Sequence, residues 1–156
     1  MKIVAVDNEP QIARIASEYF LIRPDQKQLT LQIEDAKEFI KKPQRHDLLL
    51  IDIVANNMLP HFLSEISFWQ ECHSSLNQNG IMVVNIIPDS ETHFSNILEM
   101  LRNVFGHLPL CMGVPEHKNI VLFMPLFFKA IPSNAELQKQ CLELQENSDL
   151  PFLQCV

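Results

Sequence analysis

The chain has 156 residues, a length that suits one domain with a buried core. Its formal net charge of -7 argues against a nucleic-acid backbone as the main partner. No apolar run is long enough to span a bilayer, and Asp7 and Glu9 interrupt any signal-peptide core. The four cysteines lack the spacing of a zinc knuckle, so we expect reduced thiols, no metal and a cytoplasmic location.

The chain opens with a strand and a helix. Residues 2–7 form a short β-branched run that ends in an acid, which predicts a strand. Asn8 is then placed to cap a helix whose first turn contains Pro10. The apolar positions of this helix recur at helical spacing and predict one apolar face: Ile12, Ile15, Ala16, Tyr19 and Phe20.

Two further strands follow, each ending close to an acid. Residues 28–34 alternate polar and apolar side chains, which predicts a half-exposed edge strand. Asp35 can cap the next helix, over 36–42. Residues 46–54 are mostly apolar and predict a buried strand that carries Asp52 to the rim of a parallel sheet.

The middle of the chain repeats the pattern. We expect a helix over 60–76, a turn at 77–80 and a central strand over 81–87, covered on both faces. Ser90 is expected to cap the next helix, and Gly106 to end it.

The last elements are a hairpin and a helix. Strands over 108–114 and 119–126 are joined by a link of hairpin length, so we expect them to be antiparallel. A final helix is expected over 133–146. The order predicts a single α/β domain over 1–156, with a mostly parallel sheet and one antiparallel pair at its end.

Three acids are expected at the rim where ligands bind in open α/β sheets. Asp7 ends the first strand, Asp35 follows the second and Asp52 lies at the end of the third. Such carboxylates could accept hydrogen bonds from a ribose diol and an exocyclic amine, or act as a general base. Alternatively, Asp7 and Asp35 only cap the helices that follow them.

Five stretches of the chain together resemble the spermidine synthases, and more broadly the S-adenosylmethionine-dependent methyltransferase fold. They lie within residues 3–126, and they are residues 4–10, 33–40, 46–52, 59–63 and 76–85. The resemblance implies a Rossmann-like sheet and an aminopropyltransferase of polyamine biosynthesis. Its substrates would be S-adenosylmethionine or its decarboxylated form, and a polyamine.

The resemblance also assigns roles to individual residues. Asp7 matches the acid that holds the ribose hydroxyls, and Asp35, with Ala36 beside it, matches the acid that binds the adenine amino group. Asp52 matches the first acid of the family's Asp-x-x-Asp signature, which deprotonates the attacking amine. The second acid of that signature is replaced by Ala55.

The family also has a first strand and a glycine-rich loop upstream of the position of Met1. Without that strand the sheet would have a gap about 10 Å wide, because neighbouring strands lie about 4.8 Å apart. Either the flanking strands pair directly, or a second copy covers the gap, or the chain is a fragment of a longer protein. We favour an N-terminally truncated fragment, and expect the chain alone to be poorly stable or dimeric.

Three functions fit these observations. The first is a spermidine synthase-like aminopropyltransferase with Asp52 as the base, although this chain alone could be inactive. The second is a methyltransferase-like protein that uses S-adenosylmethionine, which tolerates Ala55. The third is a non-catalytic nucleoside-binding or protein-interaction domain, with residues 123–131 and 150–156 as apolar surfaces for a partner.

Overall fold

The computed structural model describes residues 1–20, 22, 27–53, 59–127 and 133–146. It has two compact units, Met1–Leu126 and Phe127–Val156. The second unit contains helix α5 (Asn134–Glu146), which confirms the helix expected over 133–146. The proposed apolar segment 150–156 lies outside the described residues. A single domain over the whole chain stays a prediction.

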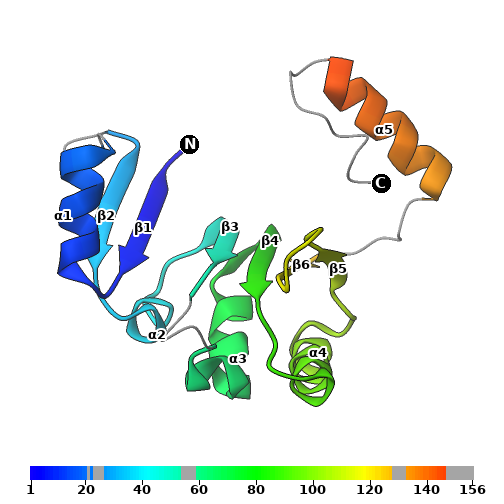
Figure 1. Cartoon of the computed structure of the whole chain (residues 1–156), viewed down its shortest axis with the longest axis horizontal. Coiled ribbons are helices and arrows are strands. Elements are labelled where there is room, and N and C mark those ends of the chain that lie inside the picture. Colours follow the sequence, from blue (N-terminus) through cyan, green and yellow to red (C-terminus); the bar gives the residue numbers. More distant parts are fainter. Residues whose placement is uncertain (21, 23–26, 54–58, 128–132, 147–156) are drawn as a thin grey trace. The chain divides into compact units, whose positions relative to one another are not determined.

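In the first unit, strands and helices follow one another in the expected order (Figure 1). The strands are β1 (Ile3–Asp7), β2 (Leu29–Ile33), β3 (His46–Ile51), β4 (Leu76–Ile86), β5 (Leu110–Gly113) and β6 (Ile120–Pro125). The helices are α1 (Pro10–Tyr19), α2 (Ala36–Phe39), the 3₁₀ helix η1 (His61–Ser64), α3 (Ile66–Ser74) and α4 (Glu91–Phe105). The predicted α/β class is confirmed.

The strands form two sheets. β1 and β2 make a parallel pair, and the other four strands follow the order β3-β4-β6-β5. β3 and β4 are parallel, whereas β6 runs antiparallel to both β4 and β5, as predicted for the final hairpin. In the part of the chain that the structure describes, β1 and β3 do not pair. Direct closure of the predicted gap by these strands is therefore wrong.

The helix expected over 60–76 is divided in two. Glu65 has an extended backbone (φ -100°, ψ 122°), so η1 ends before it and α3 begins after it. Its carboxylate accepts a hydrogen bond of 2.8 Å from Lys37 Nζ, and this bond lowers the pKa of Glu65. The break thus coincides with an ion pair to a residue 28 positions earlier in the chain, which helical periodicity cannot reveal.

The turn expected at 77–80 belongs to β4 instead. β3 pairs with β4 at His46–Leu76 and again from Leu48–Ile81, so residues 77–80 are extra residues between two paired positions. Such an irregularity interrupts the ladder without ending the strand. The predicted turn is therefore a bulge within a longer strand.

The ends of the helices agree with the sequence predictions at three of four positions. Asp35 accepts from the backbone N–H of Lys37 at 2.8 Å, and Ser90 accepts from that of His93 at 3.1 Å. Gly106 ends α4 with a φ of +80°, which glycine adopts without steric cost. At α1 the prediction of Asn8 is wrong, because the Glu9 side chain caps the helix by accepting from Gln11 N at 3.1 Å.

The core lies between the four-stranded sheet and the helices α3 and α4, which are on the same side of that sheet (Figure 1). Burial of these apolar side chains is the main stabilising term of the fold. The fully buried residues come from both helices, from η1 and from β4 and β6, and they include Leu63, Trp69, Cys72, Met82, Val84, Ile86, Ile97, Leu101, Leu122 and Met124.

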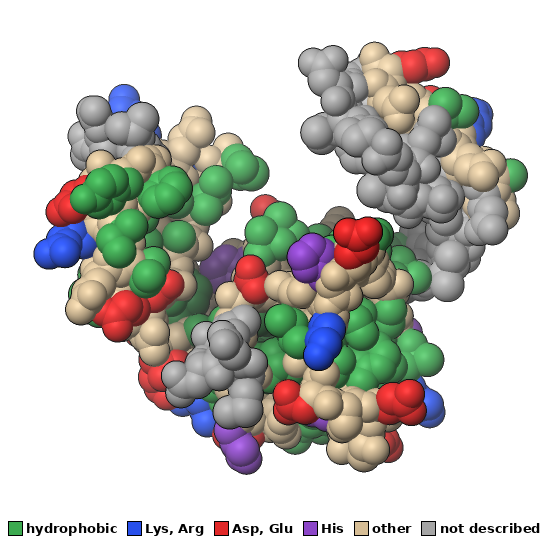
Figure 2. Space-filling view, in the orientation of Figure 1, with side chains coloured by type: hydrophobic (Ala, Val, Ile, Leu, Met, Phe, Trp, Pro, Cys, Tyr) green, Lys and Arg blue, Asp and Glu red, His purple; other side chains and the backbone are tan. Residues whose placement is uncertain are grey.

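Two predicted apolar surfaces are not covered. The apolar face of α1 is at the surface, with Ile12 50% and Tyr19 74% exposed. In β3, expected to be a buried strand, Leu48 is 51% and Leu50 67% exposed, whereas Ile51 is buried. Figure 2 shows hydrophobic side chains at the surface over the part that holds α1 and β1. Periodicity identified the residues that share a face but not whether another element packs on it.

Each helix among the described residues is too short or too polar to cross a bilayer.

Candidate functional site

The register of the four-stranded sheet brings three polar residues together at one end. Ile51 in β3 pairs with Val84 in β4, so Asp52 and Asn85, which follow them, are neighbours at the carboxyl ends of two parallel strands. On the other side of β4, Ile86 pairs with Ile120 at the start of β6, and Asn119 comes directly before it. This is the edge of the sheet at which the sequence placed a ligand.

Hydrogen bonds join these residues across three strands. Asn85 Nδ2 donates to Asp52 Oδ1 at 2.9 Å, and Asn119 Nδ2 donates to Asn85 Oδ1 at 3.0 Å. Because the Asn85 oxygen accepts from Asn119, its amide nitrogen is directed at the Asp52 carboxylate. Asp52 is exposed, and Asn85 and Asn119 are half-buried. One oxygen of the exposed Asp52 carboxylate is therefore held by the Asn85 amide, which is itself held by Asn119.

Asp7 and Asp35 lie at the corresponding ends of the other sheet. Asp7 pairs with Ile33, two positions before Asp35. Each uses its Oδ1 to accept a backbone N–H at 2.8 Å, from Glu9 and Lys37 respectively. Asp35 is exposed, and both Asp7 and Ala36 are half-buried. The capping alternative is therefore confirmed for Asp35 and wrong for Asp7, because Asp7 accepts from the N–H of Glu9, the residue that caps α1. Each acid keeps a second oxygen, Oδ2.

The three acids thus fall into two sets. Asp7 and Asp35 belong to the β1–β2 sheet and Asp52 to the four-stranded sheet, and within the described ranges no hydrogen bond or ion pair joins the two sets. The described residues also contain no group of three His, Cys, Asp or Glu side chains arranged to hold a metal ion.

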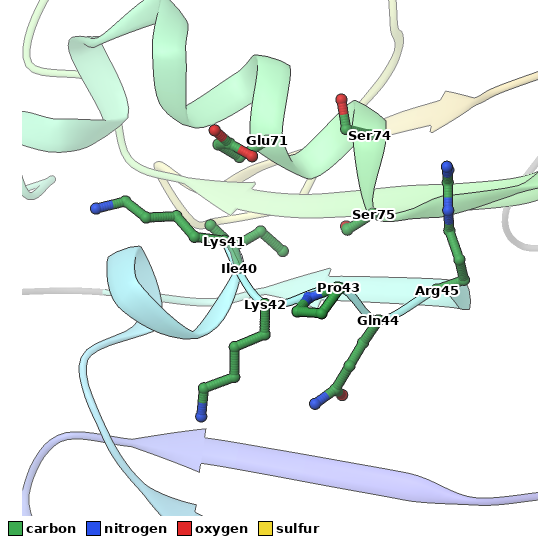
Figure 3. A pocket seen from close by; sticks show the side chains of 9 residues that line it. All are labelled: Ile40, Lys41, Lys42, Pro43, Gln44, Arg45, Glu71, Ser74 and Ser75. Atoms are coloured by element: carbon green, nitrogen blue, oxygen red, sulfur yellow. The ribbon is translucent and has the colours of Figure 1, made fainter.

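A hollow at the opposite end of β3 is a poor alternative site. Its lining includes Lys41, Lys42 and Arg45, which precede the strand, and Ser75, which follows α3. Figure 3 shows these three cationic side chains pointing in different directions. Each is already bound: Lys41 and Lys42 to glutamates, and Arg45 Nη1 to the carbonyl of Leu76 at 2.9 Å. A ligand would find no convergent charge here.

Comparison with known proteins finds relatives of the kind that the sequence resemblance implies. A polyamine aminopropyltransferase of Neisseria meningitidis serogroup A is 25% identical over 136 residues, covering 86% of this chain and 50% of the relative. The structure of human methyltransferase-like protein 13 in complex with SAH matches with a TM-score of 0.83 and 21% identity, over 96% of this chain and 72% of that one. A probable spermidine synthase from Corynebacterium glutamicum matches with a TM-score of 0.70 and 21% identity, over 89% and 53%. No family model matches the chain.

These matches establish the fold of the chain and its similarity to spermidine synthases. The chain is spermidine synthase-like and has the S-adenosylmethionine-dependent methyltransferase fold. It spans about half the length of the curated Neisseria relative that it matches.

The chain departs in two places from the site that the resemblance implies. Ala55, at the position of the second signature acid, lies outside the described residues. The three glycines of the sequence are Gly80 in β4, Gly106 after α4 and Gly113 in β5. None of them lies at the carboxyl end of β1, β2 or β3, beside the candidate acids.

Sequence reasoning missed Asn85 and Asn119. One signal was present, because Asn85 is the only polar residue in the apolar run 81–87. A polar side chain in a half-buried strand position needs a partner. The identity of that partner depends on strand register, which the sequence did not fix.

Proposed function

We propose that this chain is the nucleoside-binding and catalytic part of a spermidine synthase-like aminopropyltransferase. The observation that carries the proposal is the exposed Asp52 carboxylate, held by Asn85 at the carboxyl end of β3. The substrates would be decarboxylated S-adenosylmethionine and a polyamine. The Neisseria relative, named as a polyamine aminopropyltransferase, supports this choice.

In the proposed reaction, Asp52 acts as the general base. Its carboxylate takes a proton from the ammonium group of the acceptor, because only a neutral amine has the lone pair that attacks carbon. The amine nitrogen then forms a bond to the carbon next to the sulfonium. The carbon–sulfur bond breaks with its electron pair on sulfur, which leaves a neutral thioether. The proton on Asp52 is released to water.

The proposed roles of Asp7 and Asp35 are in nucleoside binding. Oδ2 of Asp7 would accept hydrogen bonds from the ribose hydroxyls, and Oδ2 of Asp35 would accept from the adenine amino group, with Ala36 beside it. In each case Oδ1 remains in its contact with a backbone N–H. The backbone contact and ligand binding by one carboxylate are therefore compatible.

Asparagine substitutions at these acids test the binding role separately from the fold. In D7N and D35N, the amide oxygen can keep the backbone contact while the amide nitrogen replaces Oδ2, which can no longer accept. We expect each change to weaken binding of methylthioadenosine and S-adenosylmethionine about 10- to 100-fold, as for loss of a hydrogen bond to a charged group worth about 1.5–3 kcal/mol. Isothermal titration calorimetry measures the affinities.

Asp47→Asn is the matched control for this titration. Asp47 is exposed, and its Oδ1 accepts from Asn77 Nδ2 at 2.7 Å, but it lies at the amino end of β3. The control should bind the nucleosides like the unmodified chain. A folded sample that binds neither compound would overturn the nucleoside proposal, and unchanged affinity in D7N and D35N would overturn the roles of the two acids.

A methyltransferase-like activity is the second candidate, and Ala55 favours it. A diamine carries two positive charges, and alanine at the second signature position removes one anchor for them. Methyl transfer would use S-adenosylmethionine rather than the decarboxylated form. Tighter binding of S-adenosylmethionine than of decarboxylated S-adenosylmethionine in the same titration would support this candidate over the first.

A further inference from the structure

Asn119 lies on the same face of the four-stranded sheet as the candidate base, although two strands separate them. It comes two residues before Val121, which pairs with Asn85, so Asn119 and Asn85 are diagonal neighbours across β6 and β4. Asn85 is in turn the neighbour of Asp52 across β4 and β3. The hydrogen bonds of 3.0 Å and 2.9 Å that join the three side chains follow this line across the sheet.

The backbone fixes the place of Asn119. Val114 N donates to the carbonyl of Asn119 at 3.1 Å, which closes the hairpin between β5 and β6. The next residue, Ile120, pairs with Gly113 on one side and with Ile86 on the other. The side chain of Asn119 can therefore be changed while the main-chain contacts that hold it are kept.

The direction of the Asn85 amide depends on Asn119. The two arms of an amide side chain are similar in size, but the oxygen only accepts hydrogen bonds and the nitrogen only donates them. Asn119 Nδ2 donates to Asn85 Oδ1, which leaves Asn85 Nδ2 for the carboxylate of Asp52. Turned by half a rotation, the same amide would direct its oxygen at the carboxylate, where neither atom could donate.

We propose that Asn119 is a positioning residue, which sets the orientation of the Asp52 carboxylate through Asn85. Its effect on catalysis rests on the aminopropyl transfer proposed above. With Oδ1 of Asp52 bound to the amide of Asn85, Oδ2 is the oxygen that meets the ammonium of the acceptor. A carboxylate fixed at one oxygen keeps the other within hydrogen-bond reach of the proton that it takes, whereas a rotating one does so for part of the time.

Asn119→Asp tests this role with almost no change of shape. A carboxylate at this position cannot donate to Asn85 Oδ1 and accepts from Nδ2 instead, so the amide turns away from Asp52. We expect kcat for aminopropyl transfer to fall at least about tenfold. KM for decarboxylated S-adenosylmethionine and the affinity for methylthioadenosine should not change, because Asp7 and Asp35 lie at the other sheet.

Asn77→Asp is the matched control. Asn77 Nδ2 donates to Asp47 Oδ1 at 2.7 Å, so this change also brings two carboxylates together, but at the amino end of β3. Its turnover should equal that of the unmodified chain. Unchanged kcat in Asn119→Asp would overturn the proposal. So would an equal loss of kcat when Asn119→Asp is made in the Asp52→Asn variant, because the effect would then not pass through Asp52.

Thermal unfolding tests the same network without any turnover. In the unmodified background, Asn119→Asp leaves the Asn85 amide between two carboxylates, and its nitrogen can turn to one of them. In the Asp52→Asn background both amides can turn, so that each contact again has a donor and an acceptor. The melting temperature should therefore fall by about 2–4 °C more in the first background than in the second.

The two measurements separate the positioning role from the activity. Equal losses of melting temperature in the two backgrounds would overturn the coupling of Asn119 to Asp52. Unequal losses in a chain that transfers no aminopropyl group would support the coupling and overturn the aminopropyltransferase proposal alone.

Discussion

The Asp52→Asn variant is expected to transfer aminopropyl groups about 10²- to 10⁴-fold more slowly than the unmodified protein, the usual contribution of a general base. The amide that replaces the carboxylate cannot take a proton from an ammonium. Its oxygen can still accept the hydrogen bond that Asn85 Nδ2 now gives to Asp52 Oδ1, so the local structure should be kept. Transfer from decarboxylated S-adenosylmethionine to a diamine measures the effect.

Asp47→Asn again serves as the matched variant. It makes the same chemical change at the other end of β3, at a carboxylate that also accepts from an asparagine amide. Its turnover should equal that of the unmodified protein. Equal turnover of the Asp52 and Asp47 variants would remove Asp52 from the mechanism. If the unmodified chain binds nucleosides without turning them over, the aminopropyltransferase proposal fails and the nucleoside site remains.

Replacing Trp69 with alanine should have the largest effect on stability. The Trp69 side chain is fully buried, its Nε1 donates to the carbonyl of Leu63 at 2.9 Å, and its ring lies edge-on to that of Phe68 with centroids 5.2 Å apart. Truncation leaves a cavity and an unsatisfied carbonyl, and should cost about 3–5 kcal/mol. That is a large part of the about 5–15 kcal/mol that stabilises a typical domain. Urea unfolding followed by circular dichroism measures the loss.

Tyr19→Ala is the surface counterpart of this change. Tyr19 is 74% exposed on α1, and its removal should change the free energy of unfolding by less than about 0.5 kcal/mol. A Trp69→Ala variant with the urea midpoint of the unmodified chain would contradict the assignment of Trp69 to the centre of the core. Circular dichroism is needed because Trp69 is the only tryptophan in the sequence.

The elements that sequence analysis predicted correctly depend on local chemistry. Asp35 and Ser90 cap their helices because an oxygen at that position reaches an N–H two or three residues ahead. Local chemistry does not choose between two adjacent candidates, and the cap of α1 was assigned to Asn8 where Glu9 supplies it. The strands were found from their apolar composition, and their order agrees with the structure.

The errors and omissions concern interactions between distant parts of the chain. The break at Glu65 coincides with its contact to Lys37, and the pairing of Asp52 with Asn85 depends on the register of β3 against β4. A one-residue change of that register would turn Asn85 to the other face. The candidate base was predictable from its place after an apolar run, but its supporting amides were not.

The division of the strands between two sheets also affects how the backbone opens. No ladder of hydrogen bonds runs from β2 to β5 through the described strands, because β1 and β3 are not paired. β4 and β6 each have hydrogen-bonded neighbours on both sides and contribute side chains to the buried core, so their amide protons are protected. β1 and β2 have one neighbour each and contribute no residue to that core. Hydrogen exchange should therefore distinguish the two sheets of the first unit, with the β1–β2 pair exchanging first. Local opening would then release the segment that carries Asp7 and Asp35 while Asp52 and its asparagines stay folded.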